Sequence, residues 1–253
     1  MIGFELDRVG LEIPIFGANT QSLRATLAQP FVGGFLKKSG SRVLHAEALK
    51  DVNLSIREGS RVGLIGHNGA GKSTLLRVLA GIYEPTSGMV RRGGRIVTLF
   101  DITQGMLDDA TGLENIYARG SLLGVSIRDM KKRVDEIIDF SELENFIHLP
   151  LRTYSSGMKL RLAFAVCTGI EVDVALLDEV IGVGDQRFIH KANQRLVNFL
   201  DRTGVLVLAT HSVVLMQALT TRCVVLSHGH LTFDGTTEEA ARHYNEFDGA
   251  IAV

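Results

Sequence analysis

Apolar and polar positions along the chain predict short strands that alternate with helices. Four segments rich in apolar residues have the length of buried strands, and stretches with a helical apolar period lie among them. This alternation is typical of a parallel α/β sheet. The expected strands are 49–56, 61–65, 174–177 and 204–209, and the expected helices are 72–80 and 188–200.

Both ends of the chain are predicted to add further strands. Residues 2–16 alternate loosely and contain Pro14 near their end, which favours an edge strand because proline cannot donate to a neighbouring strand. Short strands at 223–227 and 230–233 precede a closing helix at 237–247. We therefore expect an antiparallel β edge beside the parallel core.

The middle of the chain is predicted to be helical. Ser126 can cap a helix with Asp129 three positions on, and apolar residues then recur at helical spacing. These apolar residues are Met130, Val134, Ile137 and Ile138. We therefore expect one domain over 1–253, with a core of 1–105 and 171–253 and an inserted helical subdomain at 106–170.

Residues 17–45 lose this periodicity. They contain glycine, serine and proline, a possible short helix at 23–27, and a basic group formed by Lys37, Lys38 and Arg42. A surface insertion is one interpretation, because irregular segments usually lie on the surface. Contact with a membrane partner or with lipid headgroups is the other.

Composition narrows the classes of function. The chain has 253 residues, 45% hydrophobic and 22% charged, with a formal net charge of -1. Such a charge supplies no long-range field for a phosphate backbone, so nucleic acid is not an expected partner. Cys167 and Cys223 stand in apolar stretches and are expected to be buried free thiols. Neither a secretion signal nor a membrane-spanning run is found, so a cytoplasmic location is expected.

The clearest motif is GHNGAGKST at 66–74, which follows a predicted strand and opens a predicted helix. It fits the pattern G-x-x-x-x-G-K-[S/T], in which glycines let backbone N–H groups surround phosphates. Lys72 is expected to reach the β and γ phosphates, and the Ser73 hydroxyl is expected to bind Mg²⁺. The candidate ATP-binding residues are Gly66, His67, Asn68, Gly69, Ala70, Gly71, Lys72, Ser73 and Thr74.

Two acids follow the apolar strand VALLDEV at 174–180. Asp178 should emerge at the carboxyl edge of the sheet, where a carboxylate can hold Mg²⁺. Glu179 is then placed to polarise the attacking water as the catalytic base. Taken alone, both are equally well explained as ordinary loop carboxylates.

Two further elements fit the same chemistry. YSSGM at 154–158 opens an apolar helix, so Ser155 and the amide of Gly157 are candidates to bind phosphate at a helix N-terminus. His211 follows the strand VLVLAT and can hydrogen-bond the γ phosphate or the water. In isolation the first is a capped helix and the second a structural histidine.

With these four elements in this order, the chain resembles ABC transporter ATPases. GHNGAGKST corresponds to the Walker A motif, YSSGM to the signature, VALLDE to Walker B and His211 to the switch histidine. The resemblance implies a P-loop NTPase ABC cassette with a RecA-like core. It also implies a homodimer of two copies stacked head to tail, in which ATP and Mg²⁺ lie between one copy's phosphate loop and the other's signature.

The segments TGLENI, TYSSGMKLRLAFAV and LLDEVIGVGD are similar in sequence to those of the family branch that exports polysaccharides, O-antigens and teichoic acids. That likeness implies ATP hydrolysis coupled to export of a lipid-linked glycan through a transmembrane permease dimer, with this chain peripheral at the cytoplasmic face. Residues 107–124 are the expected docking surface for the permease, and Asp185 is a candidate for communication across the dimer or a plain turn residue. No additional glycan-binding domain is expected in the residues after His211.

The chain departs from the family pattern at three places. Ser156 and Met158 replace a glycine and a glutamine of the usual signature. Gln104 is the only glutamine near the expected Q-loop, whose glutamine is a cofactor and metal ligand in the family. Counting back from TGLENI places Asp101 or Ile102 nearer the usual position, however, and a plain surface glutamine explains Gln104 equally well. No aromatic residue stands just before ALKDV, so Phe16 is a candidate to stack on adenine and equally a core residue of its strand.

Three alternatives remain beside glycan export. They are an ABC exporter of lipids or drugs, a non-transport ABC ATPase, and a nucleotide-binding regulatory module without ATP turnover. Non-transport members need coiled-coil arms or paired cassettes in one chain, and neither is found in the sequence. A regulatory module that does not hydrolyse ATP needs neither a catalytic base such as Glu179 nor a histidine such as His211 that contacts the γ phosphate.

Overall fold

The computed structural model describes residues 1–15, 36–38, 44–178, 186–210 and 212–247. The chain divides into two compact units. The first unit contains residues 1–93 and 207–253, and the second contains residues 94–206. Each unit has its own buried apolar residues.

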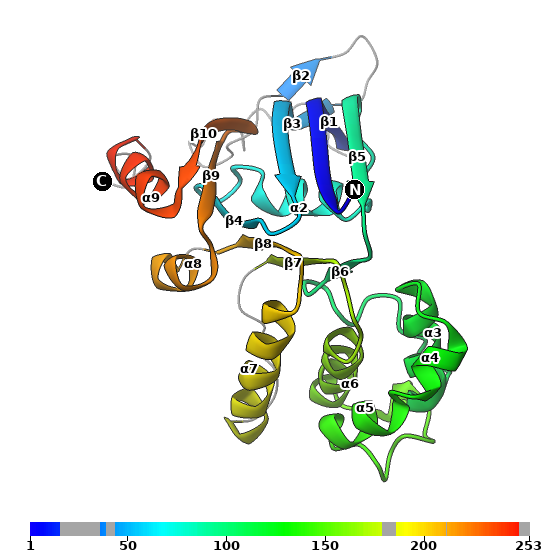
Figure 1. Cartoon of the computed structure of the whole chain (residues 1–253). Helices are drawn as coiled ribbons and strands as arrows, with labels where there is room; N and C mark the ends of the chain where they lie inside the picture. Colours follow the sequence, from blue (N-terminus) through cyan, green and yellow to red (C-terminus); the bar gives the residue numbers. More distant parts are fainter. Residues whose placement is uncertain (16–35, 39–43, 179–185, 211, 248–253) are drawn as a thin grey trace. The chain divides into compact units, whose positions relative to one another are not determined.

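Strands of the described residues form two sheets (Figure 1). The four-stranded sheet has the order β2-β3-β1-β5 and its pairs are antiparallel. The six-stranded sheet has the order β10-β9-β4-β8-β7-β6, with β4 parallel to β9, β6 parallel to β7 and β10 antiparallel to β9. A parallel core beside antiparallel strands is the arrangement that the sequence predicts.

The first unit holds most of the strands. Its strands are β1 (Gly3–Ile15), β2 (Leu36–Lys38), β3 (Leu44–Arg57), β4 (Arg61–Ile65), β5 (Ser87–Gly93), β9 (Arg222–Ser227) and β10 (His230–Thr236). Its helices are α2 (Lys72–Leu79), α8 (Val213–Leu219) and α9 (Thr237–Phe247). The predicted strands and helices at both ends of the chain are confirmed, apart from the helix at 23–27, which lies outside the described residues.

The prediction that the first strand lies at a sheet edge is wrong. Strand β1 pairs with β3 along its length and with β5 over its first half, so it is an interior strand. Pro14 is tolerated there because pairing with β5 ends at Gly10, so no neighbour on that side requires its missing N–H. Phe4, Leu6 and Val9 supply buried apolar side chains to this sheet.

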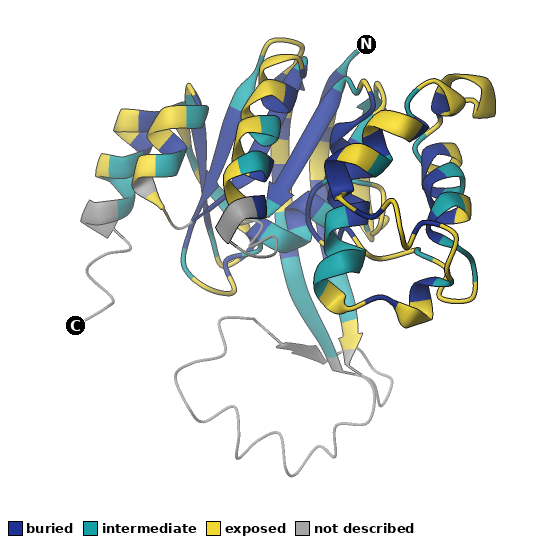
Figure 2. Ribbon diagram, turned by 90° about the horizontal axis from the view of Figure 1, so that it is seen from below, coloured by how far each residue is buried: buried dark blue, intermediate teal, exposed yellow. Residues whose placement is uncertain are grey.

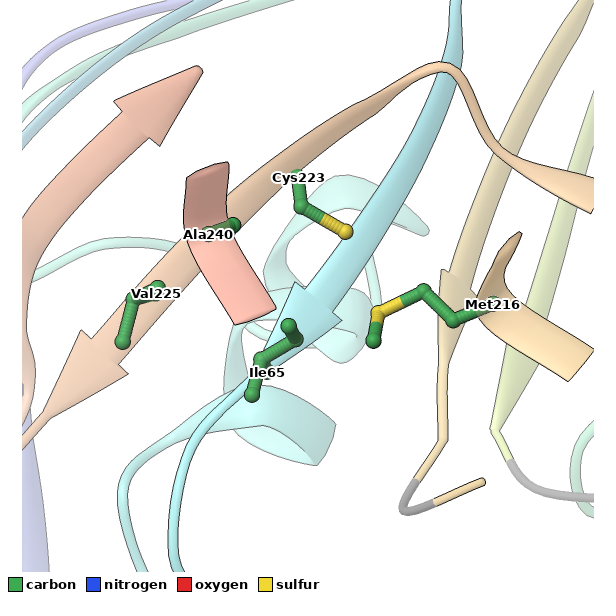
Figure 3. Packing of buried hydrophobic residues seen from close by; sticks show 5 residues of the cluster. All are labelled: Ile65, Met216, Cys223, Val225 and Ala240. Atoms are coloured by element: carbon green, nitrogen blue, oxygen red, sulfur yellow. The ribbon is translucent and has the colours of Figure 1, made fainter. Parts of the chain in front are cut away.

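Helices α8 and α9 pack against the strands through a small apolar cluster (Figure 3). It joins Ile65 of β4, Cys223 and Val225 of β9, Met216 of α8 and Ala240 of α9. Cys223 is fully buried, and burial raises the pKa of its thiol. Both cysteines are buried free thiols, as predicted.

The second unit carries the helical part of the chain. Its elements are β6 (Ile96–Thr98), α3 (Gly112–Leu122), α4 (Ile127–Lys131), α5 (Val134–Ser141), the short 3₁₀ helix η1 (Leu151–Thr153), α6 (Ser156–Thr168), β7 (Val174–Asp178) and α7 (Gln186–Asp201). Strand β8 (Val205–Ala209) contains the boundary between the two units. Strands β4, β7 and β8 are buried along nearly their whole length, as parallel core strands are (Figure 2).

The capping role of Ser126 is confirmed, because its hydroxyl oxygen accepts a hydrogen bond from the Asp129 amide at 3.1 Å. The apolar period that follows does not form one helix, however. Helix α4 ends in tight i to i+3 hydrogen bonds from the amides of Lys132 and Arg133, and α5 begins at Val134. Met130 therefore belongs to α4, whereas the later apolar residues belong to α5.

Helix α7 is fixed to α5 and α6 by an aromatic cluster and by charged side chains. The Phe140 ring lies 5.4 Å from the Phe188 ring and 6.1 Å from the Phe164 ring, centroid to centroid. The Arg195 guanidinium lies 4.1 Å from the Phe140 centroid and pairs with Glu136 at 3.0 Å. Burial lowers the pKa of Arg195, and the Glu136 carboxylate opposes that shift.

None of the helices in the described part of the chain combines the length and apolar character that a membrane span requires.

Candidate functional site

The glycine-rich turn 66–71 connects the end of β4 to the start of α2 in the first unit. Gly66 has a φ of 153°, and a side chain there would collide with the carbonyl oxygen of Leu226 in β9. Gly71 has a φ of 111° and occupies the N-cap position of α2 without any side-chain cap. Both positions require glycine, so the turn can bring its backbone close to a ligand.

Lys72 is the first residue of α2 and is buried, with 7% of its surface exposed. Its ammonium donates hydrogen bonds to the carbonyl oxygens of Gly66 at 2.5 Å and of His67 at 3.1 Å. The positive charge is therefore held inside the turn. This is the place where an ammonium meets a phosphate bound by the same turn.

The N-terminus of α2 is suited to an anion. The Leu75 amide is the first in the helix to find an intrahelical acceptor, the carbonyl oxygen of Gly71 at 2.8 Å. By helix geometry the amides before it have no such acceptor, and the helix dipole places partial positive charge there. Ser73 and Thr74 are half-buried in this first turn. The turn and the helix together form a site for a phosphate group.

Sequence reasoning missed that the turn between β9 and β10 supports the phosphate loop. The Gly229 amide donates to the carbonyl oxygen of Ala70 at 2.9 Å, and the Gly229 carbonyl accepts from the Lys50 amide at 2.9 Å. The rings of His67 and His228 lie 4.7 Å apart, centroid to centroid. The only signal in the sequence is the glycine between two short strands, which predicts a turn but not the loop it contacts.

Asp178 is the last residue of β7 and is half-buried, while the four residues before it are buried. It therefore stands at the carboxyl end of a parallel strand, as predicted. Glu179, Asp185, His211 and Phe16 lie outside the described residues. Asp178 belongs to the second unit and the phosphate loop to the first, so their convergence on one ligand stays a prediction.

Ser155 caps the N-terminus of α6, as the sequence predicts. Its hydroxyl oxygen accepts a hydrogen bond from the Met158 amide at 3.2 Å. Ser155 and Ser156 are exposed and Gly157 is half-buried, whereas residues 162–168 of the same helix are buried. Helix α6 thus presents its N-terminal end to solvent and fixes its other end in the core of the second unit.

Gln104 lies in an exposed turn that follows β6. Its amide donates to the carbonyl oxygen of Asp101 at 2.8 Å, and Asp101 has a φ of 50°. The carbonyl oxygen of Gln104 accepts a hydrogen bond from the Arg119 guanidinium at 2.5 Å. Its role as a metal and nucleotide ligand stays a prediction.

Comparison with known proteins identifies a family. The family model described as ABC transporter matches residues 49–182. The O-antigen export system ATP-binding protein RfbE of Yersinia enterocolitica is 42% identical over 87% of this chain and 92% of its own length. RfbB of Myxococcus xanthus, which has the same description, is 42% identical over 79% of this chain. The teichoic acids export ATP-binding protein TagH of Levilactobacillus brevis is 31% identical over 96% of this chain.

These relatives differ in length. The matched part covers 46% of the Myxococcus protein and 64% of the Levilactobacillus protein, but nearly all of the Yersinia protein. The chain therefore spans about half to two thirds of the longer relatives.

Two solved structures share the fold. The ATP-binding cassette MJ0796, in a dimeric structure bound to ADP and Pi, superposes with a TM-score of 0.64 at 22% identity, over 92% of this chain and 98% of that one. The ATP-binding subunit of an ABC transporter superposes with a TM-score of 0.68 at 21% identity, over 96% of this chain and 93% of that one. The predicted fold class, an ABC cassette with parallel and antiparallel strands and added helices, is confirmed.

Proposed function

The chain belongs to the ABC transporter family, as an ATP-binding ATPase of the O-antigen and teichoic acid export branch, and from that premise we propose that it drives the export of a lipid-linked polysaccharide. The observation that carries this proposal is the 42% identity to RfbE over 92% of that protein's length. The match to the ABC transporter family model, residues 49–182, includes the phosphate loop 66–74, the segment 154–158 and the acids that follow strand β7.

ATP binds with its phosphates in the turn 66–71 and its γ phosphate beside Lys72. Three observations support this placement: the Lys72 ammonium is buried, Gly66 and Gly71 stand where the backbone requires glycine, and the N-terminus of α2 has no side-chain cap. We further propose that Ser73 and Asp178 hold Mg²⁺, because a hydroxyl and a carboxylate are ligands that this ion prefers. Glu179 is the proposed base that orients the attacking water, and His211 contacts the γ phosphate.

Two copies of the chain complete the site. Ser155 and the amides at the exposed start of α6 bind the phosphates held by the other copy. Each copy therefore contributes its phosphate loop to one ATP site and its α6 N-terminus to the other. Head-to-tail pairing is supported by the exposure of that helix end and by the dimeric structure of the MJ0796 cassette.

A transmembrane permease is the second proposed partner. The polysaccharide is handled by the permease, and this chain is held through it at the cytoplasmic face of the membrane. The docking surface is 107–124, where Leu107 and Leu122 are 56% and 73% exposed. Large apolar side chains that are left exposed near both ends of one segment favour a protein contact over solvent.

The test of this function is Glu179→Gln in the complex with its permease. Removing the base should abolish ATP turnover while ATP binding is retained, because the phosphate loop is unchanged. The measurement is the rate of phosphate release beside the dissociation constant for ATP. Unchanged phosphate release would remove Glu179 as the base.

Glycan export is separated from lipid or drug export by transport into sealed vesicles. The reconstituted complex should move a polyprenol-linked oligosaccharide in an ATP-dependent way and should not move the polyprenol phosphate alone or a hydrophobic drug. ATP-dependent movement of the drug instead would identify another exporter.

A further inference from the structure

Arg119 of α3 is a buried cation that no part of the proposed mechanism uses. It is 8% exposed, and its guanidinium donates to the carbonyl oxygen of Gln104 at 2.5 Å and to the Cys167 sulfur at 3.4 Å. Gln104 stands in the turn after β6, and Cys167 lies near the C-terminal end of α6. One side chain thus connects two segments to which the resemblance assigns roles in the ATP cycle.

The surroundings of Arg119 are unfavourable for a residue that serves stability alone. In the described part of the chain its guanidinium hydrogen-bonds to two neutral groups, a carbonyl oxygen and a sulfur, and its buried Nε has no hydrogen-bond partner. A guanidinium keeps its charge when buried, and a buried charge opposed only by neutral groups is destabilising. An apolar side chain of similar length would fill the same space without this cost. Such residues are often retained because activity requires them.

Asn115, one turn earlier on the same face of α3, holds the neighbouring part of the same segment. It is fully buried, its side-chain oxygen accepts from the Leu107 amide at 2.8 Å, and its side-chain nitrogen donates to the carbonyl oxygens of Leu107 and Thr111 at 3.0 and 2.9 Å. Asn115 therefore fixes the segment to α3 alone. Arg119 differs because it also reaches α6, and α3 and α6 lie side by side in this unit (Figure 1).

We propose that Arg119 is a positioning residue that transmits movement between the turn carrying Gln104 and helix α6. This inference rests on the proposed function. Ser155 at the start of α6 and Cys167 are twelve residues apart, a distance of about 18 Å along a rigid helix. A displacement of the turn at 104–107 therefore changes the position of the helix end that binds phosphate. Arg119 makes the placement of Ser155 depend on that turn.

The test compares Arg119→Met, Arg119→Lys and the control Arg128→Met in the purified full chain. Arg128 is an exposed arginine of α4 and should have wild-type activity when replaced. Arg119→Met should lower kcat by about 10- to 100-fold, the size expected for a misplaced contact, with the dissociation constant for ATP within about twofold and no loss of thermal stability. Arg119→Lys should recover part of kcat, because an ammonium can still donate to the Gln104 carbonyl oxygen.

Hydrogen exchange gives the readout that a purely structural role would not change. In the wild type, ATP should slow exchange of the amides at 101–107 and at the start of α6 together. In Arg119→Met the two segments should respond at different ATP concentrations. The inference is overturned if Arg119→Met has wild-type kcat, or if kcat, ATP affinity and thermal stability all fall in parallel.

Failure of the inference is distinct from failure of the proposed function. A wild-type chain that hydrolyses ATP while Arg119→Met is equally active removes only the role of Arg119. A wild-type chain that neither binds nor hydrolyses ATP removes the proposed function itself.

Discussion

At the scale of single residues, Lys72 illustrates how the sequence of the phosphate loop determines a charge position. The Gly66 and His67 carbonyl oxygens accept its hydrogen bonds because a Gly66 backbone with positive φ turns the chain around the ammonium. The lysine is thereby fixed before any ligand arrives, so binding a phosphate requires little reordering of its side chain.

Replacing Lys72 with alanine should weaken ATP binding at least tenfold, because the phosphates lose a buried cation and the turn loses a charge-assisted donor. The dissociation constant for ATP, measured by calorimetry, tests this. Lys132→Ala is the matched control, since that lysine is 66% exposed and pairs with Asp129 of α4. Normal ATP affinity in Lys72→Ala would contradict the role of the phosphate loop.

At the scale of elements, α6 serves two purposes at its two ends. Its apolar C-terminal half is packed in the core of the second unit, and its N-terminal residues are exposed. Ser155 caps the helix in this structure, and the same hydroxyl is proposed to contact the nucleotide held by another copy. Capping and binding can be separated by comparison with another serine-capped helix of the same unit.

Ser155→Ala and Ser126→Ala each remove a helix-capping hydroxyl that accepts from the amide three residues on, in α6 and α4 respectively. Ser126→Ala also removes the exposed hydrogen bond that this hydroxyl donates to the Asp129 carboxylate. Each should lower the free energy of unfolding by about 1 kcal/mol. Only Ser155→Ala should also lower the ATPase rate, and it should do so without changing ATP affinity of the isolated chain. Chemical denaturation and phosphate release measure the two effects. Equal ATPase rates in both variants would assign Ser155 to capping alone.

The sequence predicts elements with a strong local pattern well, and elements that depend on a neighbouring strand poorly. Strand β4 and helix α9 begin and end where their patterns predict, because each has strong local signals. Strand β6 has only three residues and was missed, since a partner strand, β7, is what makes it a strand. The interior position of β1 also depends on β5, a strand whose polar residues gave no signal.

The candidate site also has parts that a local pattern predicts and parts that depend on distant segments. The phosphate loop is recognisable because backbone torsion alone requires its glycines. The support from Gly229 and the burial of Arg119 depend on which segments pack together, and no local pattern contains that information. The roles of Glu179, His211, Gln104 and Phe16 stay predictions.

At the scale of the whole molecule, the proposed active unit is a pair of chains in which each ATP uses Lys72 of one copy and Ser155 of the other. A mixture of Lys72→Ala and Ser155→Ala chains should then be more active than either variant alone. In an equal mixture half of the dimers are mixed and each has one intact site of two, so about a quarter of wild-type activity is expected if sites act independently.

The measurement is the ATPase rate after the two variants are mixed in different ratios. A rate that stays at the average of the two separate variants at every ratio would contradict sites shared between copies. Specific activity of the wild type should also rise with chain concentration.

The support of the phosphate loop by Gly229 has a consequence for biosynthesis. The loop is translated early, but the strand beside β4 and the turn that hydrogen-bonds Ala70 come from the last part of the described chain. While the ribosome is still making the helices between them, the nascent phosphate loop has neither the neighbouring strand β9 nor the hydrogen bond from the Gly229 amide. The chain should thus acquire affinity for ATP only late in synthesis, once β9 and β10 have left the exit tunnel.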